Sequence, residues 1–173
     1  MSTSLIVTFI GPDRPGLVES LASIVGAHGA SWSDSRMASL AERFAGIVHL
    51  TVPQARAAKL TAALQQGAAE LGLRAIVDAG GAARTDDTVA FSLDLTGADH
   101  EGIVRDVSRV LSEHGVNIEE AATETESAPM SGELVFHCAM ALSAPVGLDL
   151  GALEEALEAL ADDIMVDIEL STS

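Results

Sequence analysis

The sequence contains the same loop and helix twice, and this repeat limits the possible folds more than any other feature. GPDRPGLVESLASIVGAHG runs from Gly11 to Gly29, and GADHEGIVRDVSRVLSEHG runs from Gly97 to Gly115, so each residue of the second copy lies 86 positions after its counterpart. In both copies the apolar residues recur at the spacing of one buried helix face. The repeat predicts two similar small domains and not one large domain.

Each loop and helix belongs to a longer shared pattern. A strand with alternating apolar residues precedes each loop, and extended stretches follow each helix, including FAGIVHLTVP at Phe44–Pro53 and FHCAMALSAP at Phe136–Pro145. A second amphipathic helix and a short strand complete each half. The order strand, helix, strand, strand, helix, strand predicts an α+β fold with two tandem ferredoxin-like (βαββαβ) domains. Each should be a four-stranded antiparallel sheet with two helices on one face.

The boundary between the halves is a polar, glycine-containing stretch, GGAARTDD. We place the first domain at residues 1–79, the linker at 80–87 and the second domain at 88–173, because such composition suits a domain boundary. The offset between the copies rises from 86 to 92 at the third strand. This change predicts six extra residues around ESAPMSG, in the hairpin between the second and third strands of the second copy.

The charge of the chain is concentrated in its second half. Residues 1–86 hold seven basic and seven acidic side chains, whereas residues 87–173 hold two basic and nineteen acidic ones, which accounts for the net charge of −17. A protein that binds DNA needs a basic face, so we expect no direct contact with nucleic acid. No apolar stretch approaches the roughly 20 residues that cross a bilayer, and no export signal is visible. We therefore expect a cytoplasmic protein without membrane contact.

The repeated loop keeps three residues in both copies, namely Gly11/Gly97, Asp13/Asp99 and Gly16/Gly102. Aspartate is a preferred N-cap, so both aspartates are predicted to cap the following helix through the backbone N–H of the last glycine. A helix N-terminus also suits a small carboxylate, and a neighbouring aspartate can bind an ammonium group. Carboxylate and ammonium are the two ends of an α-amino acid. Helix capping and amino-acid binding are compatible roles for this loop.

The stretches DRPGLV … HGASW and DHEGIV … HGVNI resemble the ACT domains, small amino-acid-sensing modules of ferredoxin-like fold. Two such domains and little else look most like the group of the glycine cleavage system transcriptional repressor, whose members are thought to act through a partner transcription factor. The resemblance implies a regulatory protein with a small amino acid ligand, a protein partner, no cofactor and a role in transcriptional control of glycine cleavage. A homo-oligomer is also expected.

In ACT pairs that bind a ligand, the amino acid lies between two domains, so the resemblance implies two related binding sites. The first would use Gly11, Asp13, Arg14 and Gly16 with Asn117 and Ile118, and the second would use Asp99, His100 and Gly102 with Ser31 and Trp32. The second set departs from the family pattern, because HEG replaces RPG and Ser-Trp replaces a polar-then-aliphatic pair. We therefore expect only the first site to be competent.

Two alternatives to ligand sensing remain open. The chain could be a ligand-free assembly or regulatory subunit of a metabolic enzyme, or a small ferredoxin-like enzyme that uses an acidic hairpin or a histidine. No nucleophile–base pair, phosphate loop or zinc cluster is evident in the sequence, so we predict no catalytic and no metal-binding residues. His28 and His114, in the last turns of their helices, are predicted to bind the carbonyl groups there.

Overall fold

A computed structural model describes residues 1–80, 87–128 and 132–172 of the chain. The chain divides into two compact units, residues 1–83 and 84–173, and each is described by itself. In the first unit the elements are β1 (Ser2–Pro12), α1 (Leu17–Ala27), β2 (Ser31–Leu40), β3 (Arg43–Pro53), a short 3-10 turn (Gln54–Arg56), α2 (Ala57–Glu70) and β4 (Arg74–Ala79). In the second they are β5 (Thr88–Ala98), α3 (Ile103–Glu113), β6 (Asn117–Ser127), β7 (Leu134–Pro145), α4 (Leu150–Ile164) and β8 (Val166–Thr172).

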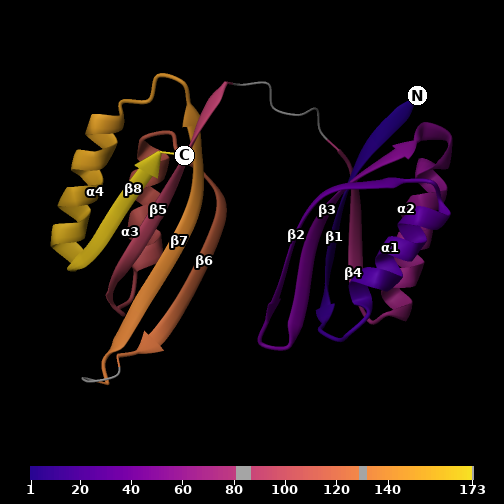
Figure 1. Ribbon diagram of the computed structural model, residues 1–173, viewed down its shortest axis with the longest axis horizontal. Helices are drawn as coiled ribbons and strands as arrows, with labels where there is room; N and C mark the ends of the chain where they lie inside the picture. Colours follow the sequence, from indigo (N-terminus) through magenta and orange to yellow (C-terminus); the bar gives the residue numbers. More distant parts are fainter. Residues whose placement is uncertain (81–86, 129–131, 173) are drawn as a thin grey trace. The chain divides into compact units, whose positions relative to one another are not determined.

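Both units have the predicted βαββαβ architecture. The first sheet has the strand order β2-β3-β1-β4 and the second has β6-β7-β5-β8, with every neighbouring pair antiparallel. In each unit both helices lie on the same side of the sheet (Figure 1). The prediction of two tandem ferredoxin-like folds is therefore confirmed.

Alternation along the strands separates a buried face from an open face. In β1, Leu5, Val7 and Phe9 point toward the helices and are at most 8% exposed. They pack with apolar residues of both helices, which are Leu17, Leu21, Val25, Leu60, Leu64 and Ala68. Each helix thus contributes three buried residues at helical spacing, as expected for a core between one sheet and one layer of helices.

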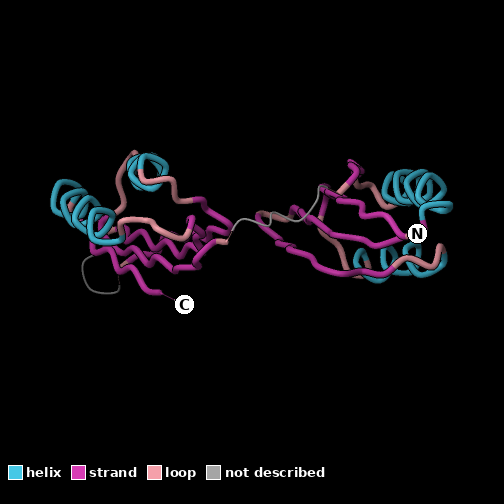
Figure 2. Tube along the Cα trace, turned by 90° about the horizontal axis from the view of Figure 1, so that it is seen from above, coloured by secondary structure: helices cyan, strands magenta, loops and turns pink. Residues whose placement is uncertain are grey.

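The second unit repeats this core with its own residues. Phe91, Leu93 and Leu95 of β5 lie against the apolar faces of α3 and α4. Cys138 on β7 belongs to the same cluster and is 4% exposed, and its burial raises the pKa of the thiol. A thiol held protonated in a core behaves as a small apolar side chain. Figure 2 shows the two layers of strands and helices within each unit.

The main difference between the copies is the hairpin after the second strand. Residues 41 and 42 connect β2 to β3, whereas residues 128–133 connect β6 to β7, and both strands of the second hairpin are one residue longer. The predicted insertion is thus placed at this hairpin, although its centre, residues 129–131, lies outside the described residues. Most of the predicted linker, residues 81–86, also lies outside them. Among the described residues no helix is long and apolar enough to cross a membrane.

Candidate functional site

The loop from Gly11 to Gly16 is fixed by contacts on both of its sides. The N–H of Asp13 donates to the carbonyl oxygen of Glu42 at 2.9 Å, and the hydroxyl of Ser39 donates to Asp13 Oδ2 at 2.5 Å. On the other side Arg14 donates to the carbonyl oxygen of Leu71 at 2.5 Å. The loop is therefore tied to the β2–β3 hairpin and to the end of α2.

The prediction that Asp13 caps α1 is wrong. The N-cap is Gly16, with φ of 90°, and no side chain accepts a hydrogen bond there. Gly102 takes the same place before α3 with φ of 100°, so the predicted cap by Asp99 is also wrong. The left-handed conformation at each of these positions favours glycine, which adopts it without strain.

Gly11 has a different reason to be glycine. It is buried, and a Cβ there would lie 2.6 Å from Leu73 Cδ2 and 2.8 Å from the carbonyl oxygen of Gly72. Gly97 meets Val166 in the equivalent way, with Cγ1 at 2.5 Å. These close approaches explain both glycines through packing alone.

His100 occupies the position of Arg14 in the second copy and makes the corresponding contact. Its Nε2 lies 3.1 Å from the carbonyl oxygen of Ile164 at the end of α4, and its Nδ1 lies 3.2 Å from the carbonyl oxygen of Glu101. Carbonyl oxygens only accept, so a neutral imidazole, with one N–H, can make only one of these bonds. In both units this loop position thus ties the first helix to the carboxyl end of the second.

The two loops differ in the charge at the helix N-terminus. In α3, Arg105 and Asp106 form a two-bond ion pair at 3.1 and 3.0 Å, and the hydrogen bond from Arg105 holds the pKa of Asp106 below its usual value. The equivalents of Arg105 and Asp106 in α1 are Glu19 and Ser20, so the first turn of α1 carries one acidic side chain and no basic one. In α3 the acidic side chain is balanced by its arginine neighbour. The charge of the first turn therefore does not favour the first loop over the second as a place for a ligand carboxylate.

Asn117 begins β6 beside a hollow of about 350 Å³, lined by Thr88, Gly115, Asn117, Glu119, Ser143, Ala144 and Pro145. Its side-chain amide donates to Glu119 Oε1 at 2.7 Å, and the hydroxyl of Ser143 donates to the same oxygen. The register of β6 against β7 shifts between Ile118 and Glu120. Glu119 is thus the extra residue of a β-bulge. Ile118 is half-buried and packs against the core.

The first unit has the same bulge with different side chains. The register of β2 shifts between Trp32 and Asp34, and the extra residue, Ser33, lies 3.2 Å from Thr51 through their hydroxyl oxygens. Ser31 is exposed, and Trp32 is half-buried against the core. The bulge was not predicted, because nothing in SWSD or NIEE indicates an unpaired residue.

Within one unit the loop and the start of the second strand do not meet. Gly11 pairs with Phe44, whereas Ser31 pairs with Thr51, so the two features are separated by seven residues along β3. At about 3.3 Å per residue this is roughly 23 Å. Gly97 and Asn117 are separated in the same way, since they pair with Phe136 and Ser143. Neither unit by itself brings the predicted groups of a site together.

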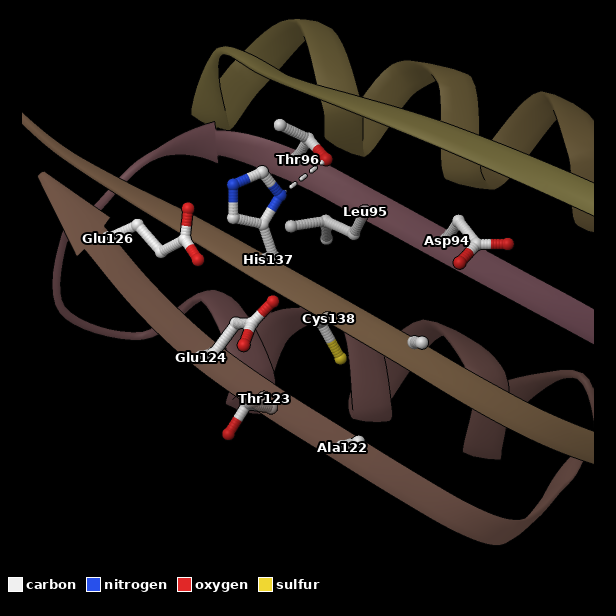
Figure 3. A pocket seen from close by; sticks show the side chains of 10 residues that line it. Asp94, Leu95, Thr96, Ala122, Thr123, Glu124, Glu126, His137 and Cys138 are labelled. Atoms are coloured by element: carbon white, nitrogen blue, oxygen red, sulfur yellow. Dashed lines mark hydrogen bonds between the residues drawn. The ribbon is translucent and has the colours of Figure 1, made fainter. Parts of the chain in front are cut away.

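A second hollow, of about 440 Å³, lies on the helix-free face of the second sheet, where the sequence predicts no site. Its lining includes Asp94, Glu124, Glu126 and His137, and His137 Nδ1 lies 3.1 Å from Thr96 Oγ1. Figure 3 shows the two glutamates of β6 and His137 of β7 projecting toward the same side. Within the described parts of the chain, no three His, Cys, Asp or Glu side chains gather into a possible metal site.

Three histidines make hydrogen bonds that differ in how far the sequence indicated them. His28 Nδ1 lies 2.9 Å from the carbonyl oxygen of Ile24, and His114 Nδ1 lies 2.9 Å from that of Val110, which confirms the predicted helix-end role. A third histidine contact was not evident from the sequence. Ser4 and His49, which are 45 residues apart in the sequence, are hydrogen-bonded. Only the strand register reveals this pair.

Known proteins share this architecture. The family model described as the ACT domain matches residues 3–78. The chain is 26% identical over 161 residues to the glycine cleavage system transcriptional repressor of Escherichia coli (strain K12), and the match covers 92% of this chain and 85% of that protein. The UPF0237 protein of Methanopyrus kandleri is 36% identical over 77 residues, 43% of this chain and 86% of that protein. The crystal structure of an unknown protein from Galdieria sulphuraria matches with a TM-score of 0.90 at 29% identity, covering 100% of this chain and 99% of that one.

Proposed function

We propose that this chain, which belongs to the ACT-domain family, is an amino-acid-sensing regulatory protein that binds a small amino acid and acts through a protein partner. The observation that carries the proposal is the separation, within each unit, of the Asp13 loop from the strand start that would complete a site. A ligand held by both features needs two units. A tandem chain supplies two units in one molecule.

The proposed ligand is held by the Asp13 loop and Asn117. Its carboxylate binds at the N-terminus of α1, where no side chain caps the backbone N–H groups. Its ammonium group binds the carboxylate of Asp13, which accepts one hydrogen bond from Ser39 and keeps further acceptor capacity. The amide of Asn117, exposed beside its hollow, contacts the same ligand.

The proposed biological role is transcriptional control of glycine cleavage through a transcription factor. It is supported by the relationship to the Escherichia coli repressor along most of both chains. It is also supported by the charge of the second half, two basic against nineteen acidic side chains, which does not suit direct contact with DNA. The partner, and not this chain, would supply the DNA-binding surface.

Calorimetric titration with each of the twenty amino acids tests the proposal. An amino acid present at about 100 times its dissociation constant should stabilise the fold by about 2.7 kcal/mol, so thermal melting provides an independent readout. We expect one or a few small amino acids to bind. If none binds at millimolar concentration, the chain is better explained as a ligand-free regulatory subunit.

Asn117→Ala is the sharpest variant, and Ser31→Ala is its matched control at the equivalent position of the other copy. Both side chains are exposed at a strand start, so neither change should unfold the protein. Asn117→Ala should weaken binding about tenfold, equivalent to about 1.4 kcal/mol, whereas Ser31→Ala should leave the affinity unchanged. Equal effects of the two changes, or no effect of Asn117→Ala, would contradict the proposed placement.

A further inference from the structure

The helix-free face of the first sheet brings a hydroxyl, an imidazole and a carboxylate together on three neighbouring strands. Ser4 on β1 places its Oγ 2.6 Å from Nε2 of His49 on β3. His49 Nδ1 lies 3.6 Å from Oδ2 of Asp34 on β2. The strands β2, β3 and β1 are adjacent in that order (Figure 1). The three side chains therefore form a row across the sheet.

The Asp34 carboxylate, 3.6 Å from Nδ1, favours one tautomer of the neutral His49 ring. An ionised carboxylate only accepts hydrogen bonds, so the favourable neutral tautomer has its proton on Nδ1, facing Asp34. Nε2 then carries a lone pair, and the Ser4 hydroxyl donates to it. A nucleophile whose proton points at a base, with that base oriented by a third group, is the arrangement that activates a serine hydroxyl.

The row is open to solvent. The side chain of His49 is 37% exposed and that of Asp34 is 80% exposed, while Ser4 is half-buried. Gly80 lies against Ser4, because its N–H donates to the carbonyl oxygen of Ser4 at 2.9 Å and a Cβ at position 80 would clash with Ser4 Oγ. Glycine at this position leaves room around the hydroxyl.

The second unit shows that the fold does not require this row. The counterparts of Ser4 and His49 are Ala90 and Ala141, while the counterpart of Asp34 is the acidic residue Glu120. The same sheet therefore forms with alanine at both of the reactive positions. The hydroxyl and the imidazole are particular to the first copy.

We propose that Ser4 is an activated nucleophile that accepts an acyl group from a small activated ester or thioester. Ser4 Oγ attacks the carbonyl carbon and forms a new C–O bond while its proton passes to His49 Nε2. The bond to the leaving alcohol or thiol then breaks, and the leaving group takes the proton from Nε2. The products are acyl-Ser4 and the free alcohol or thiol. The proposal does not depend on amino-acid sensing.

A fluorophosphonate probe tests the nucleophile directly on the full chain. The Ser4 oxygen forms a bond to phosphorus, fluoride leaves, and His49 takes the serine proton. Mass spectrometry of peptides should place the phosphonyl group on Ser4, and Ser4→Ala should abolish this labelling. His49→Gln, which retains a polar side chain that cannot act as the base, should slow it about 100-fold, the lower end of general-base effects.

Two further variants separate activation from mere exposure of a hydroxyl. Ser33 carries a neighbouring hydroxyl that faces Thr51 and not an imidazole, so Ser33→Ala should leave labelling unchanged. Asp34→Asn should slow labelling by less than His49→Gln, because the carboxylate is exposed and acts only through the imidazole. Labelling that is absent from Ser4, equal at Ser33, or unaffected by His49→Gln in a protein with unchanged melting temperature would overturn the proposal. Amino-acid binding measured on the same variants should be retained, which distinguishes the two proposals.

Discussion

Gly72 and Met165 occupy the same place at the ends of the second helices, but only one of them suits it. Gly72 follows α2 with φ of 77°, and Met165 follows α4 with φ of 54°. The left-handed conformation costs a residue with a Cβ roughly 1–2 kcal/mol. Glycine adopts it without strain. The second copy therefore carries a strained helix end that the first copy lacks.

Met165→Gly should stabilise the protein. Relief of the strain outweighs the additional chain entropy that glycine loses on folding, leaving a net gain of about 0.5–1 kcal/mol. Little packing is lost, because Met165 is 82% exposed. Urea denaturation measures the gain, and Gly72→Met is the matched control with the opposite expected sign. A loss of stability in Met165→Gly would mean that this side chain has contacts in solution that outweigh the strain.

The Arg105–Asp106 pair predicts a pH dependence with a definite sign. The hydrogen bond from Arg105 lowers the pKa of Asp106 below 3.8 in the folded protein. This contribution to stability is therefore fully present above that value and is lost as the pH falls through the folded pKa. Asp106→Asn should show a smaller loss of stability than the parent chain between about pH 5 and about pH 3. Denaturation across this range measures it, and identical profiles would exclude a contribution from the pair.

Single residues show where sequence reasoning succeeds and where it stops. The roles of His28 and His114 were predictable because their partners lie four residues away on the same helix. The partner of the Asp13 side chain was not, because Ser39 lies 26 residues away and meets it only through the hairpin. Ser4 and His49 illustrate the same limit, since their contact depends on strand register.

At the scale of strands and helices, the repeat made the architecture predictable. Apolar spacing of two and of about 3.6 residues distinguishes strands from helices, and two copies of the same order reinforce each other. The β-bulges of β2 and β6 were not predictable, because a bulge changes the pairing of one residue and leaves the alternation on either side intact.

The open face of the first sheet carries an apolar strip that predicts self-association. Ile10, Ile47 and Ile76 are 45%, 47% and 53% exposed on β1, β3 and β4. Arg74 and Asp78 lie on either side of Ile76 along β4. A two-fold axis across the strands at Ile76 would place Asp78 of each copy opposite Arg74 of the other. This charge complementarity favours a second copy of the chain as the occupant. Asp78 and His49 both lie opposite Ile6, so that copy would lie beside the Ser4–His49–Asp34 row, which is open to solvent in the monomer.

Ile47→Asp should therefore lower the molar mass measured by light scattering from that of a dimer to that of a monomer. Val146→Asp introduces the same charge at another exposed apolar residue, 65% exposed and outside the sheet face, and should leave the mass unchanged. A parent chain that is monomeric at micromolar concentration, or a dimer that survives Ile47→Asp, would contradict this interface.

For the whole molecule, the uneven charge predicts an uneven response to salt. Acidic side chains of the second unit repel one another, and salt screens this repulsion, with a Debye length of about 10 Å at 0.1 M and about 3 Å at 1 M. Hydrogen exchange on the full chain should show a larger gain in protection for the amides of β5–β8 than for those of β1–β4 as salt is added. An equal gain in both sheets would show that repulsion among the acidic side chains does not lower the stability of the second unit.

The separation of loop and strand start within each unit also limits how these molecules can connect. In the proposed site, each ligand connects one loop to one strand start. A chain in which both copies matched the family pattern would therefore offer four binding surfaces, namely two loops and two strand starts. Molecules with four such surfaces can each bind more than two neighbours and so form a branched network. If only the first site binds ligand, as expected from His100, Ser31 and Trp32 in place of the family pattern, two of these four binding surfaces remain. A molecule with two binding surfaces can close on itself or form a linear chain, but it cannot cross-link. Ligand binding would therefore not turn a concentrated solution of this acidic protein into a gel.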